Sequence, residues 1–407
     1  MASTPDHLSL TPLVAPQATY TSTPTPNVGQ TLLDRVASVS TDQLMSTVDS
    51  LAAIPSRHVN SPTVGDAAEW LRDELRSYGG RLVITEQPFP LVWGGIDTFQ
   101  RNIIATLPGD DPSAGSLVVG AHYDSRTVDV FNATSLAPGA NDNASGSAAV
   151  LEMARLLADQ TPQRTIHFAL FSAEEVTLDG SRFFVSQAQQ QGETIIAMIA
   201  LDTIGNAAGD TGGAAVRVFA APPDLAVNPA DSPGRLLGRS LAATADLSDS
   251  PLDVQLQPTL DRPGRWSDHV PFVDAGIPAL RLIEPIERTD LNHSGFDLPE
   301  TISPIYLTQV TRLTLNSLIG LAWGPQPPIL QWSETGLSWE MVPSSQPALV
   351  ILHRNGGLEF DIQQLDAGQN RVQVADVGDY EGLNIALIWN GQWIGLLSET
   401  IDLRQQP

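Results

Sequence analysis

Cysteine and lysine are both absent from this 407-residue sequence, so all 21 of its basic residues are arginine. Without cysteine the chain cannot form disulfides or thiolate metal sites, and it has no cysteine nucleophile. A bound metal would have to use histidine, aspartate and glutamate as ligands, and this set suits zinc in a catalytic site.

Positive charge and long apolar runs are also scarce. The 21 basic residues face 46 acidic ones, which gives a formal net charge of −25. Nucleic acids and anionic membranes bind basic patches, so neither is an expected partner. No apolar run approaches the roughly 20 residues of a membrane span. The N-terminal residues lack the basic and apolar regions of a signal peptide, which indicates either a cytoplasmic protein or one whose signal has been removed.

Three regions of different composition are expected. Residues 1–29 are rich in threonine, proline and serine without periodicity, which predicts a flexible tail. Such tails are more common outside the cytoplasm, so we expect an extracellular or cell-envelope location. Residues 30–324 carry alternating strand and helix patterns. Residues 325–407 begin with a proline-rich segment and continue as short alternating strands, with a hairpin signal at Asn390-Gly391, which predicts a small β-sandwich.

The region 30–324 is predicted to have an α/β fold. Apolar runs at 117–123, 165–171, 194–201 and 279–283 indicate buried strands. Segments between and after them have helical spacing, most clearly at 304–322. This alternation is typical of a mostly parallel sheet that is flanked by helices.

The first of these strands leads into Gly120-Ala121-His122-Tyr123-Asp124-Ser125. Side chains alternate along a strand, so His122 and Asp124 should point the same way. They could be a metal ligand and the carboxylate that orients it, or a core histidine beside a solvated aspartate. Asp142 is similarly open to two interpretations, because it precedes a predicted helix and could be a helix cap.

Other acidic residues and a histidine follow neighbouring strands. In an open α/β sheet the carboxyl ends of the strands share one edge, where ligands bind. That edge is expected to gather His122, Asp142, Glu174, Glu175, Asp202 and His293. Two histidines, two aspartates and two glutamates suit two zinc ions that share a carboxylate. The adjacent glutamates could supply one ligand and one base, although an exposed charged pair is the ordinary alternative.

Six motifs in this order resemble those of a known family. They are GAHYDS (120–125), PGANDNASGSA (138–148), FSAEE (171–175), LDTIG (201–205), SDHVPF (267–272) and NHSGFDLPETI (292–302). They are similar to the di-zinc aminopeptidases of metallopeptidase family 28, the group of bacterial leucyl aminopeptidase and aminopeptidases S and Y. The resemblance covers roughly residues 30–322, so residues 30–324 are expected to form a zinc peptidase domain.

The resemblance implies a role for each matching position. The ligands of two zinc ions would be His122, Asp142, Glu175, Asp202 and His293, with Asp142 as the bridging carboxylate and the histidines shared between the metals. Glu174 would be the general acid and base, and Asp124 would support His122. The implied activity is removal of N-terminal residues from peptides or proteins by a water that two zinc ions activate.

One position departs from the family pattern, and two other functions remain open. Some members have a tyrosine just before the last histidine, where it stabilises the oxyanion, and here that position is Asn292. Arg265 is a candidate replacement. The family also contains single-zinc glutaminyl cyclases, which are acyltransferases, and non-catalytic binding ectodomains. The complete set of ligands argues against the latter.

Overall fold

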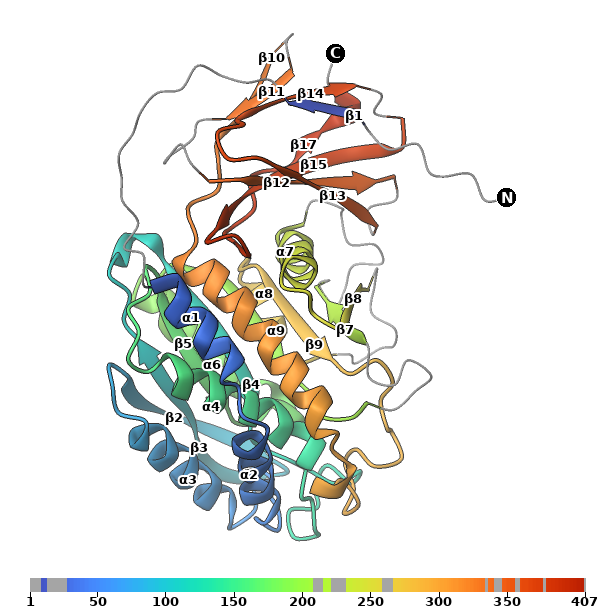
Figure 1. Ribbon diagram of the computed structural model, residues 1–407. Coiled ribbons are helices and arrows are strands. Elements are labelled where there is room, and N and C mark those ends of the chain that lie inside the picture. Colours follow the sequence, from blue (N-terminus) through green and yellow to red (C-terminus); the bar gives the residue numbers. More distant parts are fainter. Residues whose placement is uncertain are drawn as a thin grey trace.

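The computed structural model describes residues 9–12, 28–207, 215–220, 232–257, 266–333, 336–339, 346–355, 359–375 and 378–405. A large sheet between helices forms the lower part of the molecule in Figure 1, and two smaller sheets lie above it. None of the helices in the described ranges combines the length and the hydropathy of a membrane-spanning helix.

The large sheet has eight strands. In spatial order they are β2 (Val83–Trp93), β3 (Ile96–Leu107), β5 (Thr165–Phe171), β4 (Ser116–His122), β6 (Ile195–Leu201), β9 (Ala279–Ile283), β7 (Ala215–Phe219) and β8 (Asp253–Leu256). The four central strands β5, β4, β6 and β9 are parallel, whereas β2–β3 is an antiparallel hairpin at one edge. The prediction of a mostly parallel sheet is confirmed.

Both faces of the sheet are covered, as its apolar strands require. In β4, Leu117 and Val119 pack into one core, and Val118 packs into the core on the opposite face. The helices are α1 (Val28–Ala37), α2 (Thr41–Ala52), α3 (Val64–Ser77), α4 (Ser145–Leu157), α5 (Glu174–Thr177), α6 (Asp179–Gln190), α7 (Pro233–Leu247), α8 (Val270–Asp274) and α9 (Pro304–Trp323). Residues of α4 and α9 belong to the first core, and residues of α6 and α8 belong to the second.

The C-terminal strands form two antiparallel sheets, as predicted. One contains β10 (Leu330–Ser333), β11 (Gly336–Trp339), β14 (Arg371–Ala375) and β1 (Ser9–Pro12). The other contains β12 (Ala348–Arg354), β13 (Phe360–Leu365), β15 (Tyr380–Trp389), β16 (Trp393–Ile394) and β17 (Ile401–Asp402). Their facing side chains, including Leu337, Val350 and Ile385, share one apolar core, so the two sheets are a sandwich.

Strand β1 lies within the segment that composition predicts to be a tail. Its four residues pair antiparallel with β14, from Ser9 opposite Ala375 to Pro12 opposite Val372. A wholly structureless tail is therefore wrong for these four residues. The hairpin at Asn390-Gly391 is confirmed, but its loop has three residues rather than two, because Trp389 pairs with Trp393 across it.

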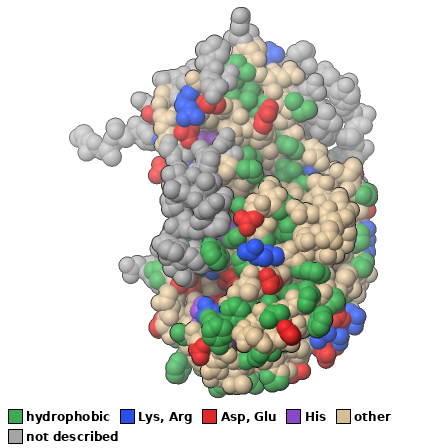
Figure 2. All heavy atoms as spheres, turned by 180° about the vertical axis from the view of Figure 1, so that it is seen from behind, with side chains coloured by type: hydrophobic (Ala, Val, Ile, Leu, Met, Phe, Trp, Pro, Cys, Tyr) green, Lys and Arg blue, Asp and Glu red, His purple; other side chains and the backbone are tan. Residues whose placement is uncertain are grey.

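The sandwich is joined to the α/β part of the molecule through α9 and α7. The Trp393 side chain is fully buried, and its indole N–H donates to Asn316 Oδ1 of α9 at 2.9 Å. Ala243 of α7 shares an apolar cluster with Leu349 and Ile388 of the sandwich. The described surface on the opposite side of the molecule mixes hydrophobic, acidic and polar side chains (Figure 2).

Candidate active site

Four neighbouring parallel strands end at the same edge of the large sheet. β4 ends at His122, β6 is followed directly by Asp202, and Glu174 and Glu175 follow β5 after two residues. β9 leads into the loop that carries His293. Parallel strands present their carboxyl ends together, and the structure brings these predicted residues to one place.

His122 is buried, and the turn that follows it holds the ring. Its Nδ1 lies 3.2 Å from the main-chain oxygen of Asp124 and 3.6 Å from Oδ1 of the same residue. The Asp124 carboxylate accepts the main-chain N–H groups of Glu174 and Glu175, each at 3.2 Å. The ring is therefore oriented by the Asp124 carbonyl, while the carboxylate anchors the turn that bears both glutamates.

A buried loop before α4 presents Asp142. The Asp297 carboxylate accepts the main-chain N–H groups of Asn141 at 2.8 Å and of Asp142 at 2.9 Å. Asn143 Oδ1 accepts the N–H of Gly146, in the first turn of α4, at 2.9 Å. The capping contact that the sequence left open is thus made by Asn143, and the Asp142 carboxylate faces the histidines.

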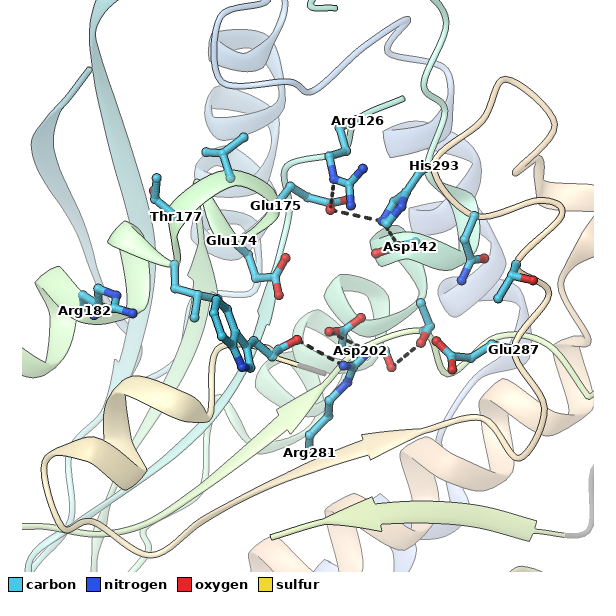
Figure 3. Close-up of a pocket in the computed structure, with 16 residues that line it drawn as sticks. Arg126, Asp142, Glu174, Glu175, Thr177, Arg182, Asp202, Arg281, Glu287 and His293 are labelled. Carbon is cyan, nitrogen blue, oxygen red and sulfur yellow. Dashed lines mark hydrogen bonds and ion pairs between the residues drawn. The ribbon is translucent and has the colours of Figure 1, made fainter. Parts of the chain in front are cut away.

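Two groups of atoms meet at Asp142. His122 Nε2 lies 3.4 Å from Asp142 Oδ1 and 3.6 Å from Asp202 Oδ1. His293 Nε2 lies 3.0 Å from Asp142 Oδ2 and 3.2 Å from Glu175 Oε2. Each oxygen of Asp142 therefore faces a different histidine, and each histidine has a second carboxylate beside it. Figure 3 shows the half of this arrangement that Asp142, Glu175 and His293 form.

This donor set fits a metal. Within the described part of the chain, His122 Nε2 and Glu175 Oε1 are buried and have no hydrogen-bond partner. Two groups of three residues have possible ligand atoms within 4.8 Å of one another. One group is His122, Glu174 and Asp202, and the other is His122, Asp142 and Glu175. Buried polar atoms without a partner cost free energy. A cation between the imidazole nitrogens and the carboxylate oxygens would satisfy them, and these ligands suit zinc.

The electrostatics of the cluster also favour bound positive charge. Burial alone would lower the pKa of His122, but Glu174 and the other surrounding carboxylates raise it well above its ordinary value. Burial would likewise lower the pKa of His293, yet adjoining carboxylates raise it to about 10. Burial would raise the pKa of Asp142, but the two histidines hold it well below the usual range. Burial raises the pKa of Glu174, and the charge of Asp202 adds to this effect.

A cavity of about 560 Å³ opens in front of the cluster. Two of its arginines contact carboxylates: Arg126 Nε lies 2.8 Å from Glu175 Oε2, and an Arg281 guanidinium nitrogen lies 3.1 Å from Asp202 Oδ2. The remaining lining residues are Asp142, Glu174, Val176, Thr177, Leu178, Arg182, Thr203, Trp266, Glu287, Thr289, Asn292 and His293. A volume of this size is typical of small-ligand sites.

Sequence reasoning missed two residues that shape the site. Arg57 is fully buried and donates to the main-chain oxygens of Tyr123, Pro138 and Gly139, so it ties the end of β4 to the Asp142 loop. Burial lowers its pKa to about 10, against nearby carboxylates that raise it. Asp297 is the other. Asp297 lies inside the motif at 292–302 and Arg57 lies outside all six motifs, and nothing in one sequence reveals which main-chain atoms they bind.

Asn292 lines the cavity, and its Oδ1 is buried without a hydrogen-bond partner in the described residues. Arg265, the candidate for oxyanion stabilisation, lies outside the described residues.

Comparisons with known proteins identify the family of this chain. The model of peptidase family M28 matches residues 102–318. A probable zinc metalloprotease of Leptosphaeria maculans is 32% identical over 330 residues, which are 72% of this chain and 77% of that protein. The chain belongs to peptidase family M28. As an M28 member it is a zinc metallopeptidase, and peptides are its substrates.

Solved structures share the M28 fold. The Legionella pneumophila LapA aminopeptidase has a TM-score of 0.58 at 23% identity, over 73% of this chain and 76% of that chain. A Fimbriiglobus ruber glutaminyl cyclase has a TM-score of 0.57 at 21% identity, over 68% of this chain and 94% of that chain. At these identities the similarity concerns the fold alone.

Proposed function

We propose that this M28 peptidase is a di-zinc aminopeptidase. The observation that carries the proposal is the arrangement around Asp142, whose two oxygens face two histidines, each with a second carboxylate nearby. One zinc ion would be held by His122, Asp202 and Asp142. The other would be held by His293, Glu175 and Asp142. This division assigns one histidine to each metal and leaves Asp142 as the bridging ligand.

Glu174 is the proposed general base and acid. Its main-chain N–H is anchored on Asp124, and its carboxylate lies 3.9 Å from His122 Nε2 with a side chain that is 10% exposed. Bound zinc supplies Lewis acidity, which polarises the scissile carbonyl and makes water nucleophilic near neutral pH. Glu174 would take the proton of the attacking water and deliver it to the leaving amine.

Removal of residues from the N-terminus is supported by three observations. The cavity has the size of a small-ligand site, which suits one end of a peptide better than a long extended chain. Glu287 lines it and is a carboxylate that is neither a proposed ligand nor the proposed base, although it also contacts Arg217 at 3.3 Å. We assign the substrate's α-ammonium group to this side. The LapA neighbour is itself named an aminopeptidase.

The test combines metal content with a peptide panel. The purified chain is loaded with zinc, its zinc content is measured, and peptides with free, acetylated and C-terminally amidated ends are assayed. We expect two zinc ions per chain and stepwise release of the first residue from free N-termini, whether or not the C-terminus is amidated. Equal cleavage of acetylated peptides would contradict an aminopeptidase.

The glutaminyl cyclase neighbour makes a second function testable in the same panel. A cyclase of that kind would release ammonia from an N-terminal glutamine and leave the peptide bond intact, with one zinc ion per chain. Two zinc ions together with free first residues would exclude it.

A further inference from the structure

One arginine in the cavity, Arg182, has no acidic partner among the described residues. Arg182 projects from the first turn of α6 and is exposed. Within the described ranges its guanidinium makes no ion pair or hydrogen bond, whereas Arg126 and Arg281 are already paired with Glu175 and Asp202. Arg182 therefore places a positive charge in the cavity wall, where the other two arginines are paired with carboxylates. A negatively charged group of the substrate could neutralise this charge.

The backbone that carries Arg182 is fixed to the sheet. Asn102 donates to the main-chain oxygen of Gly180 at 2.8 Å and accepts the N–H of Ser172 at 3.2 Å. A Cβ at Gly180 would lie 2.1 Å from the Ser172 oxygen, so the start of α6 is in close contact with the end of β5. The position from which Arg182 extends is thus set by the same segment that positions Glu174.

Figure 3 shows where Arg182 lies relative to the reacting groups. Glu174 lies between Arg182 on one side and His293 and Glu287 on the other. Under the proposed function, Glu174 delivers a proton to the leaving amine, and the α-ammonium group lies on the Glu287 side. The part of the peptide beyond the scissile bond therefore extends towards Arg182, past Thr177 and Leu178.

We propose that Arg182 is a specificity-determining residue that binds a carboxylate on the leaving part of the substrate. The inference rests on the proposed aminopeptidase function. The carboxylate would be the side chain of an acidic second residue or the terminal carboxylate of a dipeptide. Arginine suits this contact because its planar guanidinium can donate two parallel hydrogen bonds to one carboxylate. Acidic lining residues would repel such a group at sites that lack a cation.

The experiment uses the zinc-loaded full chain and four substrates with the same first residue, chosen as the one best cleaved in the peptide panel. The second position is glutamine amide, glutamate amide, lysine amide or glutamine with a free carboxylate. The glutamate amide places the charge on the side chain, and the free glutamine places it at the C-terminus. Wild type, Arg182→Gln and Arg182→Glu are compared, with Arg76→Gln as an exposed control far from the cavity lining.

We expect wild type to prefer at least one carboxylate substrate over the glutamine amide by about fivefold in kcat/KM, mainly through a lower KM. Arg182→Gln should bring this ratio close to one. Arg182→Glu should bring it below one and favour the lysine amide. The substrate that loses its advantage identifies the source of the carboxylate, and Arg76→Gln should keep the wild-type ratio.

Two results separate the failure of this inference from the failure of the proposed function. Cleavage of free N-termini by wild type without a preference for either carboxylate substrate would overturn the role of Arg182 and leave the aminopeptidase intact. An unchanged preference in Arg182→Gln would do the same. Absence of N-terminal cleavage from every free peptide would overturn both.

Discussion

Two adjacent glutamates have different environments, and this difference separates their proposed roles. Glu175 contacts both His293 and Arg126 through the same oxygen, Oε2. Among the described residues, the cationic partner of Glu174 is His122, at 3.9 Å, and burial raises the pKa of Glu174. A carboxyl group that takes up a proton readily suits a base, and a carboxylate paired with cations suits a ligand.

Replacement of Glu174 by glutamine tests this division. The amide keeps the shape of the side chain but cannot accept the proton of the attacking water. We expect kcat to fall by roughly 10²- to 10⁴-fold while zinc content stays at the wild-type level. Glu69→Gln, at an exposed position of α3, is the matched control. A Glu174→Gln enzyme with near-normal turnover would exclude Glu174 as the base.

A buried carboxyl group behind the site should make stability depend on pH. Glu284 is fully buried and accepts hydrogen bonds from Asn141 Nδ2 at 2.9 Å and from the Asn206 N–H at 3.0 Å. Burial raises its pKa from 4.5 to about 8. The folded state therefore keeps a proton that the unfolded chain loses, so this stabilisation is complete below about pH 4.5 and is lost as pH rises through 8.

Glu284→Gln should remove that pH dependence. Glutamine is neutral at every pH and can still accept from both asparagines. The variant and wild type should have similar free energies of unfolding near pH 4.5. By pH 9 the variant should be the more stable, by at most about 5 kcal/mol. Denaturant unfolding across this range measures the difference, and parallel pH profiles for the two proteins would refute the assignment.

At the scale of elements, the short turn from β5 to α6 positions more of the site than its length suggests. It carries Glu174, Glu175 and Arg182. Its main chain makes two hydrogen bonds to the Asp124 side chain and two to the Asn102 side chain. Helical spacing cannot reveal α5, since four residues make only one turn.

Gly180→Ala should disturb this turn. The added Cβ would lie 2.1 Å from the Ser172 oxygen and 2.6 Å from Asn102 Oδ1, so the start of α6 must move. We expect a loss of about 1–3 kcal/mol in the free energy of unfolding and a fall in kcat/KM. Gly65→Ala in α3 is the matched control, because only the Arg101 side chain lies near its Cβ, at 3.7 Å. Equal effects of the two substitutions would show that α6 tolerates the shift.

Elements that bury a long periodic face were predictable, and the contacts made between them were not. The strand at 117–123 and the helix at 304–322 match β4 and α9 closely, because burial of apolar faces sets their sequences. The gathering of His122, Asp142 and His293 followed from the edge rule for parallel strands. Spacing along the chain does not determine three-dimensional distances. It therefore could not predict that Asp124 binds the main chain of both glutamates, that Arg57 is buried, or that Arg126 pairs with Glu175.

At the scale of the whole molecule, zinc should contribute to stability as well as to chemistry. Several carboxylates lie close together in the site, and bound cations would relieve their repulsion. A ligand present at 1,000 times its dissociation constant adds about 4 kcal/mol to the free energy of unfolding. We expect chelation to lower the melting temperature and added zinc to restore it. An identical melting temperature with and without chelator would contradict preferential binding of zinc to the folded chain.

The extracellular or cell-envelope location remains a prediction from composition, and the sandwich has no chemistry assigned to it. The sandwich nevertheless packs closely against the peptidase domain. A Cβ at Gly320 of α9 would lie 2.3 Å from the Ile394 oxygen of β16, so only glycine allows this approach. Helix α9 therefore packs against the large sheet and also against the sandwich.

The pairing of β1 with β14 has a consequence for biosynthesis. β1 is the first described strand to leave the ribosome, and its partner is among the last. β1 therefore remains without its partner strand while the entire catalytic domain is translated. This four-residue strand can complete its sheet only when translation is nearly finished.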